Sequence, residues 1–105
     1  MKIKKSTQDK LNDFVFRNDL YAFHSEENLA KAICNESGEL LKNYVWGPDW
    51  VKRYNLKDDN KKDEIADILI FCFYYLQEMG WNADELINRK IIKNINKYEV
   101  KNNEN

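Results

Sequence analysis

One acidic residue stands in the middle of an apolar stripe. Apolar residues recur at the spacing that lines up one face of a helix, at about 100° per residue, and Glu36 occupies a position on that face. Glu39 follows one turn later, on the edge of the stripe. A carboxylate that faces a core is costly unless it is neutralised, paired or bound to a cation. The apolar members of the stripe are Leu29, Ile33, Leu40 and Tyr44.

A second pair of acids, Glu64 and Asp67, repeats this spacing. From residue 65 to residue 76, every side chain except that of Asp67 is apolar, aromatic or Cys. If the two helices pack antiparallel, the four carboxylates converge, and their repulsion raises their pKa values unless divalent cations lie between them. Because ligation by oxygen alone selects a hard ion, we expect Mg²⁺, for which Mn²⁺ can substitute.

A simpler explanation covers part of this pattern. Glu64 lies in the first turn of its expected helix, where the helix dipole favours any acid, and solvated charges are common on helices. That explanation does not account for Glu36 within an apolar stripe, or for Asp67 within an apolar run. We therefore take the acids of both helices together as the expected metal ligands.

Helices are the elements expected to carry these acids. Gly and Pro are rare, with three and one residues, and no useful segment alternates with the period of two that a half-buried strand shows. The fold class is therefore predicted to be all-α, a four-helix bundle that homo-oligomerisation completes. Residues 1–100 are expected to form one domain and 101–105 a polar, frayed tail. The expected helices cover about 7–21, 25–44, 60–79 and 83–97.

The residues between the helices indicate where each one begins and ends. Ser25 and Asn60 are expected N-caps of the second and third helices, and Asn82 caps the fourth. Pro48 cannot continue the second helix, and Gly80 closes the third.

The third expected helix has almost no polar face, so protein must surround it on all sides. The other helices of one short chain are too few to enclose it. We therefore predict a homodimer or homotetramer, with the aromatic residues of this helix near the subunit contact. Those residues are Phe71, Phe73, Tyr74 and Tyr75.

Composition argues against several other partners. The 105 residues carry a formal net charge of −1, so no overall field attracts nucleic acid or an anionic membrane. The Lys-rich start lacks the apolar region of a signal peptide, and no apolar run reaches the length of a membrane span. We expect a cytoplasmic protein. Cys34 and Cys72 lie singly in apolar patterns and are expected to be reduced and buried.

The ordered acids resemble the ExxE…ExxD signature of the all-alpha NTP pyrophosphohydrolases, which include MazG-like and dCTP pyrophosphatase-like proteins. The first motif is residues 36–39 and the second 64–67. The likeness extends beyond the acids, over about residues 24–98. The further residues that resemble family positions are His24, Asn28-Leu29-Ala30, Tyr44-Val45-Trp46, Lys90, Asn94, Lys97 and Tyr98. The chain departs from the family at Glu26 and Glu27, and at Glu99, where Pro or basic residues are common.

The resemblance implies Mg²⁺-dependent hydrolysis of a nucleoside triphosphate to the monophosphate and pyrophosphate, with water attacking the α-phosphorus. This activity would serve housekeeping of the nucleotide pool. The implied metal ligands are Glu36, Glu39, Glu64 and Asp67. For the general base we favour Glu39, because it lies on the edge of the stripe, with Glu36 as the second catalytic carboxylate.

The fourth helix offers cations for the phosphates. Lys90, Asn94 and Lys97 share one helix face, although Lys residues near a helix C-terminus also complement the helix dipole without any ligand. The resemblance favours phosphate binding. It also implies that the base and sugar contact His24, Asn28, Trp46 and Tyr98, whereas a lone His or Trp is often only structural.

Two other protein classes bury acids on helices. A di-iron four-helix protein needs Glu-x-x-His pairs, and the one His of this chain is not in such a pair. A non-catalytic helical oligomer that binds nucleotides in a regulatory role is the second alternative, because a fold does not specify a reaction.

Overall fold

The protein is all-helical in the part of the chain that the computed structural model describes, residues 3–44 and 58–103. Within these residues there are four α-helices and no strand, which confirms the predicted class. The helices are α1 (Lys5–Arg17), α2 (Glu26–Leu41), α4 (Asp58–Met79) and α5 (Ala83–Asn103), with short 3-10 turns η1 (Tyr21–Phe23) and η2 (Lys42–Tyr44).

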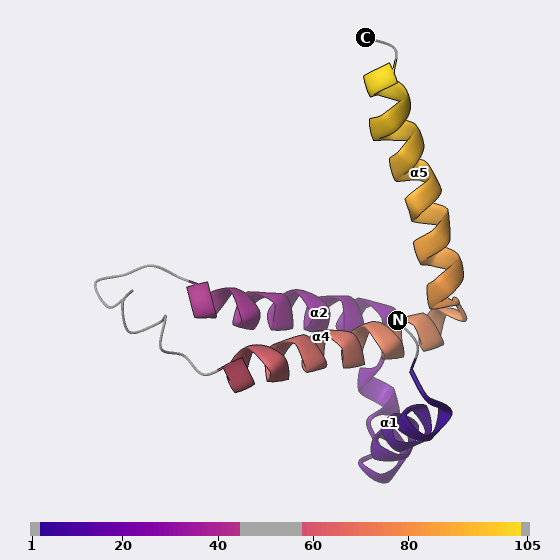
Figure 1. The fold of residues 1–105 in the computed structure, drawn as a ribbon. Helices are drawn as coiled ribbons and strands as arrows, with labels where there is room; N and C mark the ends of the chain where they lie inside the picture. The colour runs from indigo at the N-terminus through magenta and orange to yellow at the C-terminus, as the bar shows by residue number, and fades with distance from the viewer. Residues whose placement is uncertain (1–2, 45–57, 104–105) are drawn as a thin grey trace.

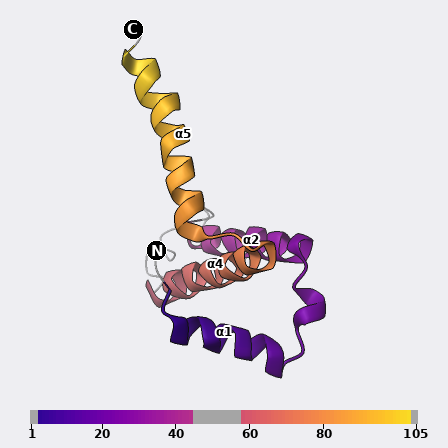
Figure 2. The same ribbon diagram turned by 90° about the vertical axis from the view of Figure 1, so that its right-hand side faces the viewer.

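Helices α2 and α4 form the centre of the structure. They lie side by side and run in opposite directions (Figure 1), and α1 packs below α4 on the side away from α2 (Figure 2). Helix α5 leaves the end of α4 at a steep angle and extends away from the other helices (Figure 1). The antiparallel pairing brings the middle of α2 opposite the first half of α4, as the acidic motifs require.

The helix ends follow from local hydrogen bonding. The Ser25 hydroxyl accepts a bond from the backbone N–H of Asn28, and the Asn82 side chain accepts one from the N–H of Glu85. Gly80 has a positive φ of 71° immediately after α4, a conformation that glycine adopts at no steric cost. These three predicted boundaries are confirmed.

Other boundaries differ from the prediction. Helix α1 ends at Arg17, because Asp19 takes a positive φ of 50° and starts the turn into η1. Asn60 is not an N-cap, because α4 already begins at Asp58 and the Asn60 side chain bonds to Asn43 instead. Helix α5 continues to Asn103, six residues beyond its expected end at 97.

The small core lies where α1, α2 and α4 meet. Val15, Leu29 and Tyr74 are buried there, one from each helix. The Tyr74 hydroxyl donates a 2.8 Å hydrogen bond to the backbone carbonyl of Leu11, which ties α4 to α1. Partly buried neighbours are Leu11, Leu20, Ile70, Phe71, Phe73 and Tyr75.

This packing bears on three of the predictions. The aromatic residues of α4 pack against the core of their own chain, and their expected place near a subunit contact stays a prediction. Both cysteines are free as predicted, but Cys34 is exposed and only Cys72 is partly buried. Helix α5 stands apart from the other three helices (Figure 2), so the completion of the four-helix bundle by homo-oligomerisation stays a prediction.

The hydrogen bond of Tyr74 gives a first prediction. Tyr74→Phe removes the donor and leaves the Leu11 carbonyl without it, so we expect the free energy of unfolding to fall by about 1 kcal/mol. Tyr21→Phe is the matched control, because Tyr21 is 62% exposed and should not change stability. Urea unfolding followed by circular dichroism measures both. Equal stability of the Tyr74 variant and the wild type would contradict the assigned role.

Candidate metal centre

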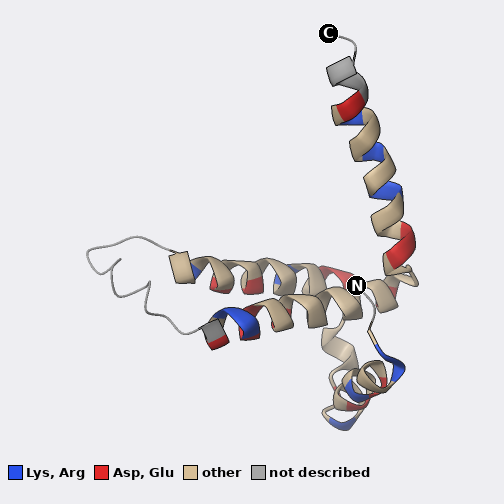
Figure 3. Cartoon of the chain, viewed as in Figure 1, with Lys and Arg blue, Asp and Glu red and all other residues tan. Residues whose placement is uncertain are grey.

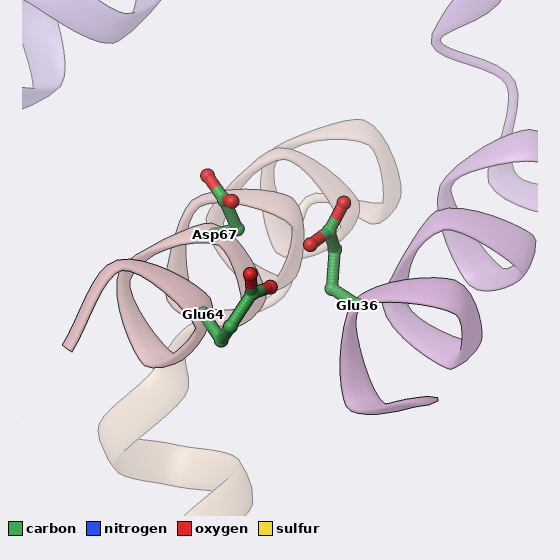
Figure 4. A group of neighbouring side chains, drawn as sticks. All are labelled: Glu36, Glu64 and Asp67. Carbon is green, nitrogen blue, oxygen red and sulfur yellow. The ribbon is translucent and has the colours of Figure 1, made fainter. Parts of the chain in front are cut away.

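Three carboxylates from two helices converge at one point. Glu36 of α2 and Glu64 and Asp67 of α4 each offer an oxygen, and these three oxygens all lie within 4.8 Å of one another. Figure 4 shows the side chain of Glu36 reaching across from α2 towards the two acids of α4. All three residues are partly buried. The predicted convergence of acids from both helices is therefore present for these three.

The positions follow from helix geometry. Glu64 and Asp67 are three residues apart, so they occupy neighbouring positions on one face of α4. That face is turned towards α2, where Glu36 takes a place in the otherwise apolar stripe. Leu29, two turns earlier on the same stripe, is buried in the core and holds α2 in this orientation.

The electrostatics of the cluster are unfavourable without a cation. Partial burial raises the pKa of Glu64, and a hydrogen bond with Glu36 and the charges of Glu36, Glu39 and Asp67 raise it further. The Oε2 atom of Glu64 is buried, and no group of the described residues forms a hydrogen bond with it. A buried oxygen without a partner, among like charges, is the environment that a bound cation stabilises.

The donor set fits a hard divalent ion. All three ligands are carboxylate oxygens, which Mg²⁺, Mn²⁺ and Ca²⁺ prefer. An octahedral Mg²⁺ shell places its most distant oxygens about 4.2 Å apart, so oxygens within 4.8 Å of one another need only small side-chain movements. With three protein ligands, water and phosphate oxygens would complete such a shell.

Glu39 lies beside the cluster rather than in it. Its carboxylate accepts a 2.8 Å bond from the Lys42 ammonium, one turn later, and this bond raises the pKa of Lys42. The charge of Glu39 still contributes to the raised pKa of Glu64. The role of Glu39 as a fourth ligand stays a prediction.

An amide pair next to the acids was not anticipated from the sequence. Asn43, in η2, is buried, with an exposed fraction of 3%. Its side chain donates to the Leu40 carbonyl and accepts a 2.7 Å bond from the Asn60 side chain. This bond joins the end of α2 to the start of α4 and so limits how far the two acidic segments can separate. Asn43 interrupts an apolar pattern in the same way as Glu36, and this interruption is the sequence feature that could have indicated a buried polar residue.

His24 contacts α4 at Tyr74, two turns after Asp67. It directly follows η1 and is partly buried. Its ring contacts that of Tyr74 at a tilt of 55°, with a centroid distance of 4.6 Å. Tyr74 is seven residues after Asp67, on the same face and about 10 Å further along the helix. A cavity of about 320 Å³ opens beside this pair of rings. Its lining residues are Asn12, Val15, Tyr21, His24, Tyr74, Gln77 and Glu78.

The remaining predicted ligands are not brought to the acids within one chain. Lys90, Asn94, Lys97 and Tyr98 are all exposed on α5, whose basic residues lie away from the α2–α4 pair (Figure 3). Asn28 is exposed in the first turn of α2. Trp46 lies outside the described residues.

Comparisons with known proteins agree with this arrangement. The sequence model of the MazG-like family matches residues 31–105, which include both acidic pairs. A crystal structure of a pyrophosphatase from the archaeon Archaeoglobus fulgidus is similar in fold, with a TM-score of 0.78 and 27% sequence identity over 92% of this chain and 98% of that one. No curated protein matches the chain significantly.

Replacing one acid should separate repulsion from metal binding. In EDTA, we expect Asp67→Asn to unfold at a higher temperature than the wild type, because one of three mutually repelling charges is removed. In the wild type, Mg²⁺ at one hundred times its Kd should add about 2.7 kcal/mol of stability, and the variant should lose this gain. Thermal unfolding by circular dichroism, with EDTA or MgCl₂, measures both effects.

Asp63→Asn is the matched control for this experiment. Asp63 is exposed on the same helix and is not one of the three clustered acids, so its variant should keep the full response to Mg²⁺. An Asp67 variant that responds to Mg²⁺ as strongly as the wild type would exclude Asp67 as a ligand.

The amide pair gives a further prediction. Asn43→Ala removes the bonds to Leu40 and Asn60, so we expect a loss of about 1–3 kcal/mol in the free energy of unfolding and a weaker response to Mg²⁺. Asn35→Ala, at an exposed position of α2, should leave stability unchanged or slightly higher, since Ala favours helices. Urea unfolding with and without MgCl₂ measures these changes. If the two variants behave alike, Asn43 does not hold the site together.

Proposed function

Because the chain belongs to the MazG-like family, we propose that it is a magnesium-dependent pyrophosphohydrolase that cleaves nucleoside triphosphates to the monophosphate and pyrophosphate. The observation that carries this proposal is the convergence of Glu36, Glu64 and Asp67. The likeness to an archaeal pyrophosphatase supports the same class of reaction. We place the activity in the cytoplasm, in housekeeping of the nucleotide pool.

The three clustered acids and Glu39 would have different roles in hydrolysis. Glu36, Glu64 and Asp67 would hold Mg²⁺, with Glu39 as a fourth ligand when it leaves Lys42. When bound, the ion would supply positive charge to the phosphate oxygens and would lower the pKa of a bound water. Glu39, at the edge of the cluster, would take a proton from the water that attacks the α-phosphorus. As the new bond between the water oxygen and the α-phosphorus forms, the bond from the α-phosphorus to the bridging oxygen breaks, and pyrophosphate leaves. Glu36 is the second candidate for this base.

The nucleoside would lie along α4, towards His24. The cavity beside the His24–Tyr74 ring pair has the volume of a small-molecule site, and one of its lining residues, Tyr74, follows Asp67 by two turns of α4. His24 offers a directed hydrogen bond, and Tyr74 an aromatic surface. We propose that the base enters this cavity, while Asn28, Trp46 and Tyr98 remain further candidates for base and sugar contacts.

Phosphate contacts from α5 would need a second copy of the chain. Lys90, Asn94 and Lys97 stand away from the acids of their own chain (Figure 3), so they can reach the phosphates only from a neighbouring subunit. A homodimer or homotetramer is therefore part of this proposal.

The pairing of Glu39 with Lys42 favours a second candidate function. With Glu39 engaged in this way, the cluster has three acids that can bind a cation and no free base, which suits a regulatory oligomer that binds nucleotides without cleaving them. Activity measurements separate the two functions.

The test is release of pyrophosphate from a panel of standard and modified nucleoside triphosphates with Mg²⁺. We expect Glu36→Gln to reduce kcat/KM by at least about 100-fold, because one ligand is lost. Glu39→Gln should reduce kcat by about 100-fold or more, because the group that takes the proton of the attacking water is lost.

Glu27→Gln is the control, since Glu27 is exposed at the start of α2 and should leave the rate unchanged. Binding of nucleotides without release of pyrophosphate from any of them would support the regulatory candidate instead. Full activity of the Glu36 variant would remove the site assignment.

A further inference from the structure

A lysine ammonium lies at the edge of the acidic cluster. Lys42, the first residue of η2, forms a 2.8 Å ion pair with Glu39, one turn earlier. The hydrogen bond to Glu39 raises the pKa of Lys42 most, and the negative charge of Glu64, on α4, raises it further. Lys42 therefore interacts with an acid of each motif, one on α2 and one on α4.

The ion pair between Lys42 and Glu39 does not hold the fold together. The Lys42 side chain is 70% exposed and that of Glu39 39% exposed, and exposed ion pairs contribute little to stability. A similar pair, Lys31 with Glu27 at 3.3 Å, lies in the first two turns of α2, away from the three clustered acids. Because the pair is weak, the Lys42 ammonium can leave Glu39 at little cost.

A second cation lies at the same end of the helix pair. The bond between Asn43 and Asn60 joins the end of α2 to the start of α4, and Lys42 and Lys61 are the sequence neighbours of these two residues. The Lys61 ammonium lies 5.3 Å from the centre of the Tyr44 ring, and basic residues mark the start of α4 in Figure 3. Positive charge from both helices is thus present next to the acids.

Charge decides where the Lys42 ammonium lies. A divalent cation among the acids repels the ammonium and competes with it for Glu39, because like charges disfavour each other and both attract the same carboxylate. A triphosphate beside the acids offers the ammonium several negative oxygens in exchange. Lysine suits such a transfer, since it is a compact charge with three donors on a flexible stem and a common ligand of phosphate.

We propose that Lys42 is a phosphate-binding residue that keeps Glu39 occupied until a triphosphate is bound. In the nucleotide-free protein its ammonium holds Glu39. When a triphosphate lies beside the acids, the ammonium moves to the phosphate oxygens, and Glu39 becomes available as a ligand or base. This inference rests on the proposed function, because it assigns a residue of the same site to the substrate. It makes the ion pair of Glu39 compatible with catalysis.

The first test measures Mg²⁺ alone, without nucleotide. Lys42→Met keeps an unbranched stem and removes the charge, so Glu39 no longer has a competing cation. We expect the Kd for Mg²⁺ to fall about two- to five-fold, the range that corresponds to the loss of an exposed ion pair. Lys31→Met breaks the similar pair with Glu27 and should leave the Kd unchanged. Calorimetric titration with MgCl₂ measures both.

The second test uses inorganic tripolyphosphate at a fixed, saturating concentration of Mg²⁺. Lys42→Met should raise the Kd for tripolyphosphate at least about ten-fold, because a charged hydrogen bond is lost. Lys42→Arg keeps a charged donor and should bind nearly as tightly as the wild type, as should Lys31→Met. One substitution at Lys42 thus strengthens the binding of one ligand and weakens that of the other, whereas a purely structural role would weaken both.

The third test asks whether Lys42 acts through Glu39. In a double-mutant cycle, the gain in Mg²⁺ affinity from Lys42→Met should be smaller when Glu39→Gln is already present. An equal gain in both backgrounds would show that Lys42 does not occupy Glu39, and would overturn the proposal. Circular dichroism verifies that each variant is folded.

Two other results would also overturn the proposal. One is a Lys42→Met protein that binds tripolyphosphate as tightly as the wild type, and the other is a wild type that does not bind tripolyphosphate. These measurements do not involve release of pyrophosphate. A protein that shows the opposite effects on Mg²⁺ and tripolyphosphate but cleaves no nucleotide would therefore contradict the proposed reaction and leave the role of Lys42 intact.

Discussion

The repulsion between three carboxylates is the constraint on which the rest of this structure depends. Glu36, Glu64 and Asp67 are held within a few ångströms of one another, and Glu64 has a buried oxygen for which the described residues supply no hydrogen-bond partner. Such an arrangement opposes folding unless the surrounding contacts outweigh it or a cation neutralises it. Electrostatic repulsion therefore destabilises the antiparallel pair of α2 and α4 at the place where chemistry is expected.

Contacts at both ends of the acidic cluster oppose this repulsion. Towards the core, Leu29 and Tyr74 are buried, and Tyr74 is also bonded to α1. At the other end, the Asn43–Asn60 bond joins the helix ends. A buried amide pair is suited to this role, because its hydrogen bonds have fixed directions, whereas apolar contacts alone allow sliding.

The sequence predicted the features that arise from local patterns. The all-helical class, the caps at Ser25 and Asn82, and the convergence of acids all follow from spacing and residue type. Features set by competition between partners could not be predicted in this way. Glu39 bonds to Lys42, Asn60 bonds across to Asn43, and α5 leaves the bundle, and each outcome depends on which neighbour is present in space.

The direction of α5 is decided at the short connector that begins with Gly80. Gly80 has a positive φ, Asn82 caps the new helix, and from there α5 extends 21 residues as one rod. A rod of this length is about 30 Å long, so a rotation of 10° at its base moves its far end by about 5 Å. The backbone angles of Gly80 thus determine the direction of α5, and a small change in them moves every residue of that helix.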